Sequence, residues 1–353
     1  MDGKDENPPQ VYRWTKLSIV SVTSVAVLQI AFAVAPLFLG ANAIERLTTL
    51  FIYGILALMW NALAGYGGLV SVGQQAFFGL GAYAVLRLCD FGVSVFPAML
   101  LAAVLVALVS VPIGLVMLRL RVGEFAVGMW VVAELAHLLV NLDSLIQGET
   151  GTSLIAMLAF APPQRRAFTY WAALGTMVAL AWVVFALLRA RLGTAAQAIR
   201  DNEEAASSVG VPVAATKRTL FILSAFGCAA AGALWVATTI SFQPKAYFSV
   251  QWSAYMIFMV LVGGIGTFEG PVLGAVLFFA VETLFGSAGV WYMIGLGATA
   301  LVFSLLLPRG IWGTLEQRFA IQLLPVGYFL RYGSTSPKRA PQPRDNSQEP
   351  AKP

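Results

Sequence analysis

Residues 189–218 read RARLGTAAQAIRDNEEAASSVGVPVAATKR and form the longest strongly charged stretch between two apolar segments of membrane-spanning length. Apolar residues recur in it at helical spacing, and Thr194 stands where its side chain could cap a helix N-terminus. The stretch therefore predicts a short polar helix that lies outside the bilayer. Such a helix, held between membrane spans, is suited to binding a partner in the water.

Charged residues and helix breakers define this predicted helix further. Arg200 is expected to pair with Glu203 and Glu204, which follow it by three and four residues. Gly210 is expected to end the helix, and Pro212 prevents the helix from resuming. The loop is thus predicted to hold one helix with a defined C-terminal stop.

The composition of the rest of the chain indicates a membrane protein. Of its 353 residues, 59% are hydrophobic and only 11% are charged, against about 25% charged in typical globular chains. The mean hydropathy is +0.79. The fold class predicted from these numbers is an all-α polytopic membrane protein.

About ten apolar segments approach the length needed to cross a bilayer, and we expect eight to ten transmembrane helices. Their approximate bounds are 17–39, 44–64, 69–88, 93–118, 123–142, 168–188, 219–241, 252–262, 271–285 and 290–307. The eighth is short for a span. The expected organisation is an N-terminal segment (1–16), a transmembrane domain (17–307) and a largely disordered tail (308–353), because the residues from Ser334 onward are rich in proline, serine and charge.

The distribution of basic residues predicts the orientation. If the N-terminus is cytoplasmic, most of the 22 basic residues fall on the cytoplasmic side. The exceptions are Arg46, Arg87, Arg165, Arg166 and Lys245. Because positive residues collect in the cytoplasm, the loop at 189–218 and both terminal segments are expected there.

Two glycine-rich stretches are candidates for the interior of the domain. Residues 65–83 read GYGGLVSVGQQAFFGLGAY, and residues 263–275 read GGIGTFEGPVLGA. Small residues allow close helix packing in lipid, and on this interpretation the structural glycines are Gly67, Gly68, Gly263, Gly264, Gly266 and Gly270. The alternative is functional, because amides inside a span are unfavourable unless they are paired or hydrated. On that interpretation Ser71, Gln74 and Gln75 line a polar translocation path.

Glu134 and His137 are the candidate ionisable pair within a span. They are three residues apart, so they share one face of the fifth predicted helix. Either a structural polar contact or a place on the translocation path would account for them. A metal site is not expected, because the chain has a single histidine and a metal would need further ligands.

Several enzyme classes are disfavoured by missing motifs. The sequence has no GxxxxGK[ST] loop to hold nucleotide phosphates. It also has no GxSxG elbow, and no basic and aromatic groove indicates a nucleic-acid partner. We therefore expect a chain that is not itself an enzyme.

The charged loop carries a family motif. Residues 200–210, RDNEEAASSVG, contain EAAxxxG as Glu204, Ala205, Ala206 and Gly210, and they resemble the loop by which ABC importer permeases dock on their ATPase. The two glycine-rich stretches, LFILSAFGCAAAGAL at 220–234 and LLLPRGIWG at 305–313 occur in matching order. From about residue 48 to 313 the chain resembles the membrane permeases for branched-chain amino acids, the LivM-like group.

The resemblance implies an ABC importer permease fold in the bacterial inner membrane, with 189–218 as the coupling loop. The residues expected to couple to the ATPase are Arg200, Asp201, Glu203, Glu204, Ala205 and Gly210. The implied partners are cytoplasmic ABC ATPase subunits, a second and related permease subunit, a periplasmic substrate-binding protein and membrane lipid. ATP and Mg²⁺ would bind to the partner ATPase, with no cofactor on this chain.

The substrate implied is a branched-chain or other hydrophobic amino acid. Val72 and the pair Gln74–Gln75 depart from the residues common in the family, and GETGTSL at 148–154 is only loosely similar to the usual TGGxxGL. These departures leave urea, short amides and small aromatic carboxylates as alternative substrates of the same machinery. An ion-coupled secondary transporter is an alternative of a different class.

Overall fold

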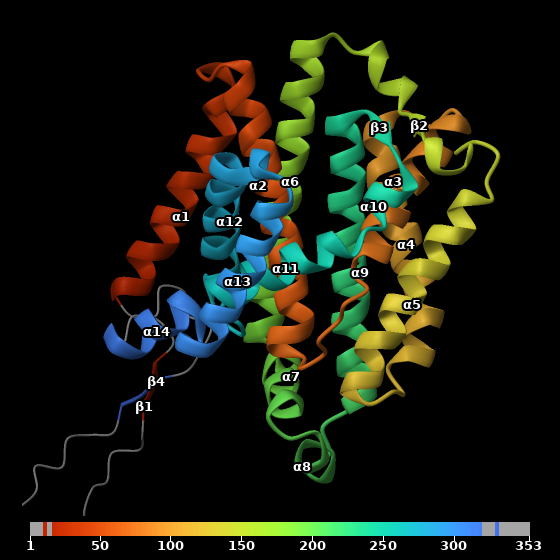
Figure 1. Ribbon diagram of the computed structural model, residues 1–353. Coiled ribbons are helices and arrows are strands. Elements are labelled where there is room, and N and C mark those ends of the chain that lie inside the picture. Colours follow the sequence, from red (N-terminus) through yellow and green to blue (C-terminus); the bar gives the residue numbers. More distant parts are fainter. Residues whose placement is uncertain (1–9, 13–15, 320–328, 332–353) are drawn as a thin grey trace, which may run out of the picture.

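The computed structural model describes residues 10–12, 16–319 and 329–331, which form a bundle of helices (Figure 1). The longer helices are α1 (Lys16–Val34), α2 (Ala41–Asn61), α3 (Gln75–Asp90), α4 (Val95–Met117), α5 (Val122–Asn141), α6 (Pro162–Arg189), α7 (Arg191–Asp201), α9 (Val213–Thr239), α11 (Val250–Gly263), α12 (Gly270–Phe285), α13 (Val290–Leu306) and α14 (Gly310–Phe319). Shorter helices are α8 (Glu203–Ser208), α10 (Pro244–Tyr247), the π-helical turn η2 (Ala62–Tyr66) and the 3₁₀ turns η1 (Ala35–Leu37), η3 (Gly148–Thr150), η4 (Ile155–Ala159) and η5 (Gly286–Ala288).

Among the described residues, strands form two short antiparallel pairs. The first pairs β1 (Gln10–Tyr12) with β4 (Phe329–Arg331). The second pairs β2 (Thr152–Ser153) with β3 (Ser241–Phe242), with Thr152 opposite Phe242. The second pair joins the segment after α5 to the segment after α9 at one end of the bundle.

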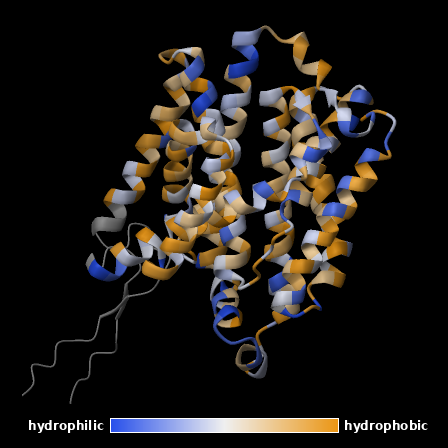
Figure 2. Ribbon diagram, in the orientation of Figure 1, coloured by the Kyte–Doolittle hydropathy of each residue, from blue (hydrophilic) through white to orange (hydrophobic). Residues whose placement is uncertain are grey.

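The membrane-spanning character of the bundle is confirmed. Within the described residues, nine helical segments are long enough and apolar enough to cross a bilayer, inside the predicted range of eight to ten. The residues along these helices are mostly apolar, and the polar residues lie mainly toward the ends of the bundle, as Figure 2 shows. The span of α1 has no buried residue, whereas most of the α2 span and of the α9 span is buried inside the chain.

The third predicted span is wrong as a single helix. Residues 69–74 are not helical, and α3 begins only at Gln75 and has 16 residues. At about 1.5 Å per residue, α3 covers about 24 Å, less than the ~30 Å hydrocarbon core. Figure 1 shows the non-helical segment climbing from the end of α2 toward α3 inside the bundle. Irregular backbone at this depth is tolerated where protein surrounds it.

Two other predicted spans differ at their ends. The sixth begins at Pro162, not near residue 168, because Pro162 and Pro163 occupy the first helical positions of α6, where a missing N–H matters least. The eighth is short as expected. Its helix α11 has 14 residues, and the preceding α10 extends the span to Pro244–Gly263.

The predicted tail is partly corrected. Residues 310–319 form the helix α14, so the first part of the segment at 308–353 is ordered. The predicted disorder from Ser334 onward, like the N-terminal segment before Gln10, falls outside the described residues.

The loops are divided between the two ends of the bundle as the distribution of basic residues predicts. The α4–α5 turn, α7 and α8 lie at one end, which we call the α8 end. The α1–α2 junction, the start of α6 and the β2–β3 pair lie at the other, which we call the β2 end. The ion pair between Arg166 and Glu45, at 2.6 Å, joins α6 to α2 at the β2 end.

Glycines permit the tightest packing in the core, between α3 and α9. A Cβ built on Gly81 would lie 2.1 Å from the carbonyl oxygen of Ala229, and one on Gly232 would lie 1.9 Å from that of Phe78. Two backbones in such contact exclude any larger side chain. Close packing is therefore the role of these glycines.

Candidate functional site

The charged loop folds into two helices at the α8 end of the bundle. α7 ends at Asp201, and Asn202 breaks the helix with an extended backbone (φ −159°, ψ 107°). The Asn202 side chain then accepts a hydrogen bond of 3.0 Å from the N–H of Ala205 and caps α8. The predicted cap at Thr194 is wrong. Thr194 lies inside the first turn of α7 and donates to the carbonyl of Arg191, because the helix begins several residues earlier than expected.

Arg200 fastens α7 to the body of the chain. Its Nη1 donates to the carbonyl oxygen of Gly65, at 3.0 Å. The predicted pairing of Arg200 with Glu203 and Glu204 is wrong, because the break at Asn202 takes those residues off the helix of Arg200. Arg200 pairs with its neighbour Asp201 instead, at 3.0 Å.

Glu203 has a different partner. Its carboxylate accepts a hydrogen bond of 2.7 Å from Nζ of Lys217 on α9, and the side chain of Lys217 is only 11% exposed. This ion pair fixes α8 to the start of the following span. Arg200 and Glu203, both near the middle of the charged loop, thus tie it to the bundle.

The two glycine-rich stretches meet beside Arg200. Asn61, the last residue of α2 before the first stretch, binds the second: its Oδ1 accepts from the N–H of Gly266 at 2.8 Å, and its Nδ2 donates to the carbonyl of Thr267 at 2.8 Å. Gly68 and Gly266 both have positive φ, +68° and +74°. A Cβ on Gly68 would lie 3.2 Å from Cα of Arg200, and one on Gly266 would lie 2.9 Å from its Nη1. Glycine allows both turns to approach the arginine.

Asn61 and the π-helical turn η2 were not found by sequence reasoning. The turn widens the end of α2 just before the glycines, and such turns recur at functional sites. Periodicity does not reveal a local change of helix type. An amide inside an otherwise apolar span was the one available signal, since an unpaired amide there is unfavourable.

The face of α8 that points away from the bundle is polar and open. The side chain of Glu203 is 50% exposed, and that of Asp201, at the end of α7, is 68% exposed. Val209, which follows α8, is 79% exposed. A groove on this face is lined by Asn202, Glu203, Glu204, Ser207, Ser208 and Val213. Ala205 is also exposed, whereas Ala206 is buried against the bundle. The predicted coupling residues therefore lie together, except that Arg200 is directed inward.

Gly210 ends α8 as predicted. Its φ is +85°, its N–H bonds to the carbonyl of Ser207 at 3.0 Å, and the N–H of Val211 bonds to that of Ala206 at 3.0 Å. This pair of bonds defines a Schellman motif. A Cβ on Gly210 would meet no atom within 4 Å, so its backbone conformation, rather than crowding, requires glycine.

Ser71, Gln74 and Gln75 are buried inside the chain, between 0% and 1% exposed. Oγ of Ser253 on α11 donates to Oε1 of Gln75. Neither polar atom of the Gln74 amide has a partner. In this conformation the three side chains are enclosed by protein, so a place on a water-filled path stays a prediction.

Glu134 and His137 belong to a cluster near the β2 end. His137 Nδ1 lies 3.2 Å from a Glu134 oxygen, and Nε2 lies 2.9 Å from a Glu149 oxygen. The imidazole stacks on Phe248, with 5.7 Å between the ring centroids. The backbone N–H of Lys245 donates to the same Glu149 at 3.1 Å. These contacts join α5, η3 and α10, and a place for Glu134 and His137 on the translocation path stays a prediction.

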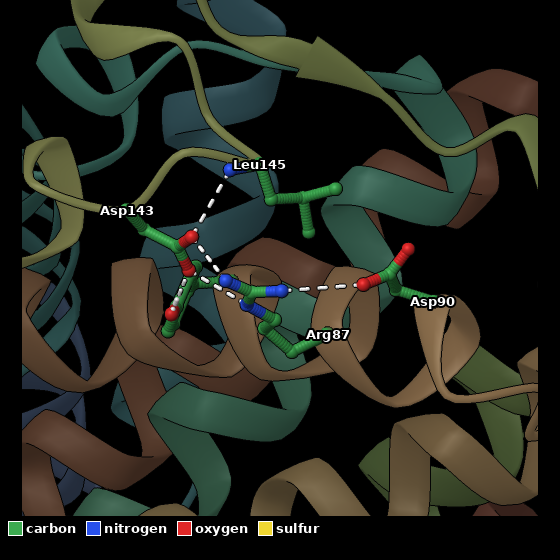
Figure 3. A network of polar contacts seen from close by, with 5 residues as sticks. Arg87, Asp90, Asp143 and Leu145 are labelled. Carbon is green, nitrogen blue, oxygen red and sulfur yellow. Dashed lines mark hydrogen bonds and ion pairs between the residues drawn. The ribbon is translucent and has the colours of Figure 1, made fainter.

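A second polar network ties α3 to the segment after α5 (Figure 3). Nε of Arg87 donates to Asp143 at 2.6 Å, and Nη1 pairs with Asp90 at 3.2 Å. The hydroxyl of Tyr83 and the N–H of Leu145 also donate to Asp143. Burial of Asp143 opposes its ionisation, but these hydrogen bonds outweigh burial and hold the pKa of its carboxyl below its usual value.

This network predicts unequal effects for the two acids that contact Arg87. Asp143→Asn should lower the Tm of the purified protein by about 3 °C or more, because the side chain is only 9% exposed and holds several donors. Asp90→Asn is the matched control and should change the Tm little, since its side chain is 46% exposed. Because the pKa of the Asp143 carboxyl is lowered in the folded chain, its ionised form stabilises the fold at neutral pH. That stabilisation is lost as the pH falls through the pKa of the folded state. Equal Tm values for the two variants at pH 7 would contradict this account.

The sequence comparisons place this geometry in a family. Residues 42–309 match the family model described as the branched-chain amino acid transport system permease component. The high-affinity branched-chain amino acid transport system permease protein LivM of Escherichia coli K12 is 27% identical over 314 residues, covering 81% of this chain and 73% of that protein. LivM of Salmonella typhimurium LT2 is 28% identical over 313 residues, with the same coverage.

Among solved structures, an inward-facing conformation of a metal-chelate type ABC transporter aligns with 85% of this chain and 99% of its own. Its sequence identity is 16% and its TM-score is 0.46, so the assignment rests on the sequence matches. The matched region contains the charged loop, both glycine-rich turns and the spans that hold them. The chain belongs to the permease component family of branched-chain amino acid transport systems.

Proposed function

We propose that this chain is the membrane-spanning subunit of an ATP-driven ABC importer for branched-chain or other hydrophobic amino acids. The observation that carries the proposal is the linkage at Arg200, which connects an exposed polar helix pair to both glycine-rich turns. Motion of α7 would reach the ends of α2 and α11 through this one side chain. The absence of a nucleotide phosphate loop from the sequence fits an ATPase on a separate subunit.

The partners follow from the two ends of the bundle. Asp201, Glu203, Glu204 and Ala205 on the open face at the α8 end would contact the cytoplasmic ATPase. A periplasmic binding protein would deliver substrate at the β2 end, and a second, related permease subunit would complete the pore. On this proposal the chain lies in the inner membrane with both termini in the cytoplasm, as the distribution of basic residues favours.

Purification of the tagged chain from its native membrane tests this assembly. We expect an ABC ATPase and a second permease to co-purify, and ATP hydrolysis to rise when the cognate binding protein is added with its ligand. Thermal-shift screening of that binding protein against leucine, urea, short amides and benzoate identifies the substrate class, and leucine is the expected ligand. Purification without any ATPase partner contradicts the proposal.

A further inference from the structure

The carboxylate of Glu282 lies near the C-terminal end of α12, beside a group of tyrosines. The hydroxyl of Tyr53 on α2 donates to Oε1 of Glu282 on α12 at 2.9 Å. Tyr255 on α11 and Tyr292 on α13 both lie within electrostatic reach of the same carboxylate. Residues from four helices therefore come together around one acid.

The cluster lies within membrane-spanning segments. Tyr53 is in the span of Ala41–Tyr66, and Glu282 is in the span of Gly270–Ala288, three residues before the end of α12. An ionisable residue within a span faces the protein interior or a water-filled cavity, because lipid cannot solvate it.

The acid has no basic partner in the described part of the chain. Its one hydrogen bond is the one from Tyr53, and it is only partly buried. The Tyr292 hydroxyl is buried and has no hydrogen-bond partner. Among the described residues the carboxylate thus has a single hydrogen bond and no ion pair, and the Tyr292 hydroxyl has no hydrogen-bond partner.

The rings around the cluster also favour a cation. Tyr255 and Tyr53 pack on Phe278, with ring centroids 4.6 Å and 5.1 Å apart, and Tyr53 lies 6.5 Å from Trp252. Aromatic faces attract cations, most strongly where water is excluded. An ammonium group has three donors and would find acceptors in the Glu282 carboxylate and the tyrosine hydroxyls.

We propose that Glu282, with Tyr53, Tyr255 and Tyr292, forms a transient binding site for the ammonium group of a zwitterionic amino acid during its passage. This inference rests on the proposed function and narrows its substrate. Substrates that bear an ammonium group are favoured. Aromatic carboxylates are disfavoured, because their charge repels that of Glu282.

Tyr292→Phe is the sharpest variant for this site. Because its hydroxyl makes no hydrogen bond to the described residues, the variant should keep the Tm of the parent protein. Leucine uptake by the complete complex in proteoliposomes should nevertheless fall several-fold. Glu282→Gln should lower uptake by about ten-fold or more, since the amide keeps a hydrogen-bond acceptor but removes the negative charge that attracts the ammonium group. Thr283→Val is the matched control on α12, because Thr283 is exposed and bonds only to its own helix.

A ligand comparison needs no variant. In the complex without binding protein, leucine should raise the Tm, and 4-methyl-2-oxopentanoate, which has the same carbon skeleton without the ammonium group, should not. Normal leucine uptake by a stable Tyr292→Phe variant, or equal Tm shifts by the two compounds, would overturn the site. A parent complex that shows no ATP-driven uptake but keeps the leucine-specific Tm shift would instead overturn the proposed function.

Discussion

Arg200→Ala should abolish most ATP-driven uptake while leaving the protein folded in the membrane. The substitution removes the hydrogen bond to the Gly65 carbonyl and the side chain that fills the space between Gly68 and Gly266. A hydrogen bond from a charged group contributes about 1.5–3 kcal/mol, which corresponds to a loss of roughly ten- to a hundred-fold if it is made in only one state of the cycle. Uptake and ATP hydrolysis are measured together in proteoliposomes.

Uptake should fall in this variant while ATP hydrolysis continues without stimulation by the binding protein. Arg191→Ala is the matched control, because Arg191 is on the same helix and is exposed to solvent. Arg200→Lys should recover part of the uptake, since it keeps the charge but not the planar guanidinium. Unchanged coupling in Arg200→Ala would mean that the motion of α7 does not pass through this contact.

Gly210→Val has the second large expected effect. A β-branched residue at φ +85° is strained by about 1–2 kcal/mol, and the chain relieves that strain by changing the direction in which it leaves α8. No neighbouring atom lies within 4 Å of the added Cβ, so the damage stays local to the turn. Uptake should drop about ten-fold while insertion into the membrane is retained.

The chain offers a matched control for this strain at the opposite end. Gly92 has φ +88° and also has open space where its Cβ would be. Gly92→Val should therefore lower the Tm by a similar amount and leave the binding-protein stimulation of ATP hydrolysis intact. If both variants retain that stimulation, Gly210 is only a helix stop and has no part in coupling.

Much of the fold could be predicted because membrane spans are decided by long apolar runs. The second, fourth and fifth predicted spans each match an observed helix near the expected bounds, whereas the helix of the seventh begins at Val213 rather than near residue 219. The stop at Gly210 was equally predictable, since a left-handed C-cap is a local property of glycine. The third span failed because the backbone between Gly67 and Gln75 is held by surrounding protein, which hydropathy does not report.

The candidate site was predictable in its residues but not in its contacts. The motif located the residues of α8. Helical spacing predicted the wrong partners for Arg200, because the prediction assumed a continuous helix and the helix breaks at Asn202. The contact of Arg200 with Gly65 spans 135 positions of sequence, and no pattern within one loop contains it. The cluster at Glu282 was missed for the same reason, since its tyrosines come from three other helices.

The most direct test of this account is to measure leucine uptake by the complete complex in proteoliposomes under separate energy sources. The importer is reconstituted in its native orientation, with ATP inside the proteoliposomes and binding protein outside. Uptake should then be rapid and should persist when proton and sodium gradients are collapsed. Without ATP, an imposed gradient of either ion should drive none. Uptake that follows an ion gradient and ignores ATP would contradict the account and would identify a secondary transporter.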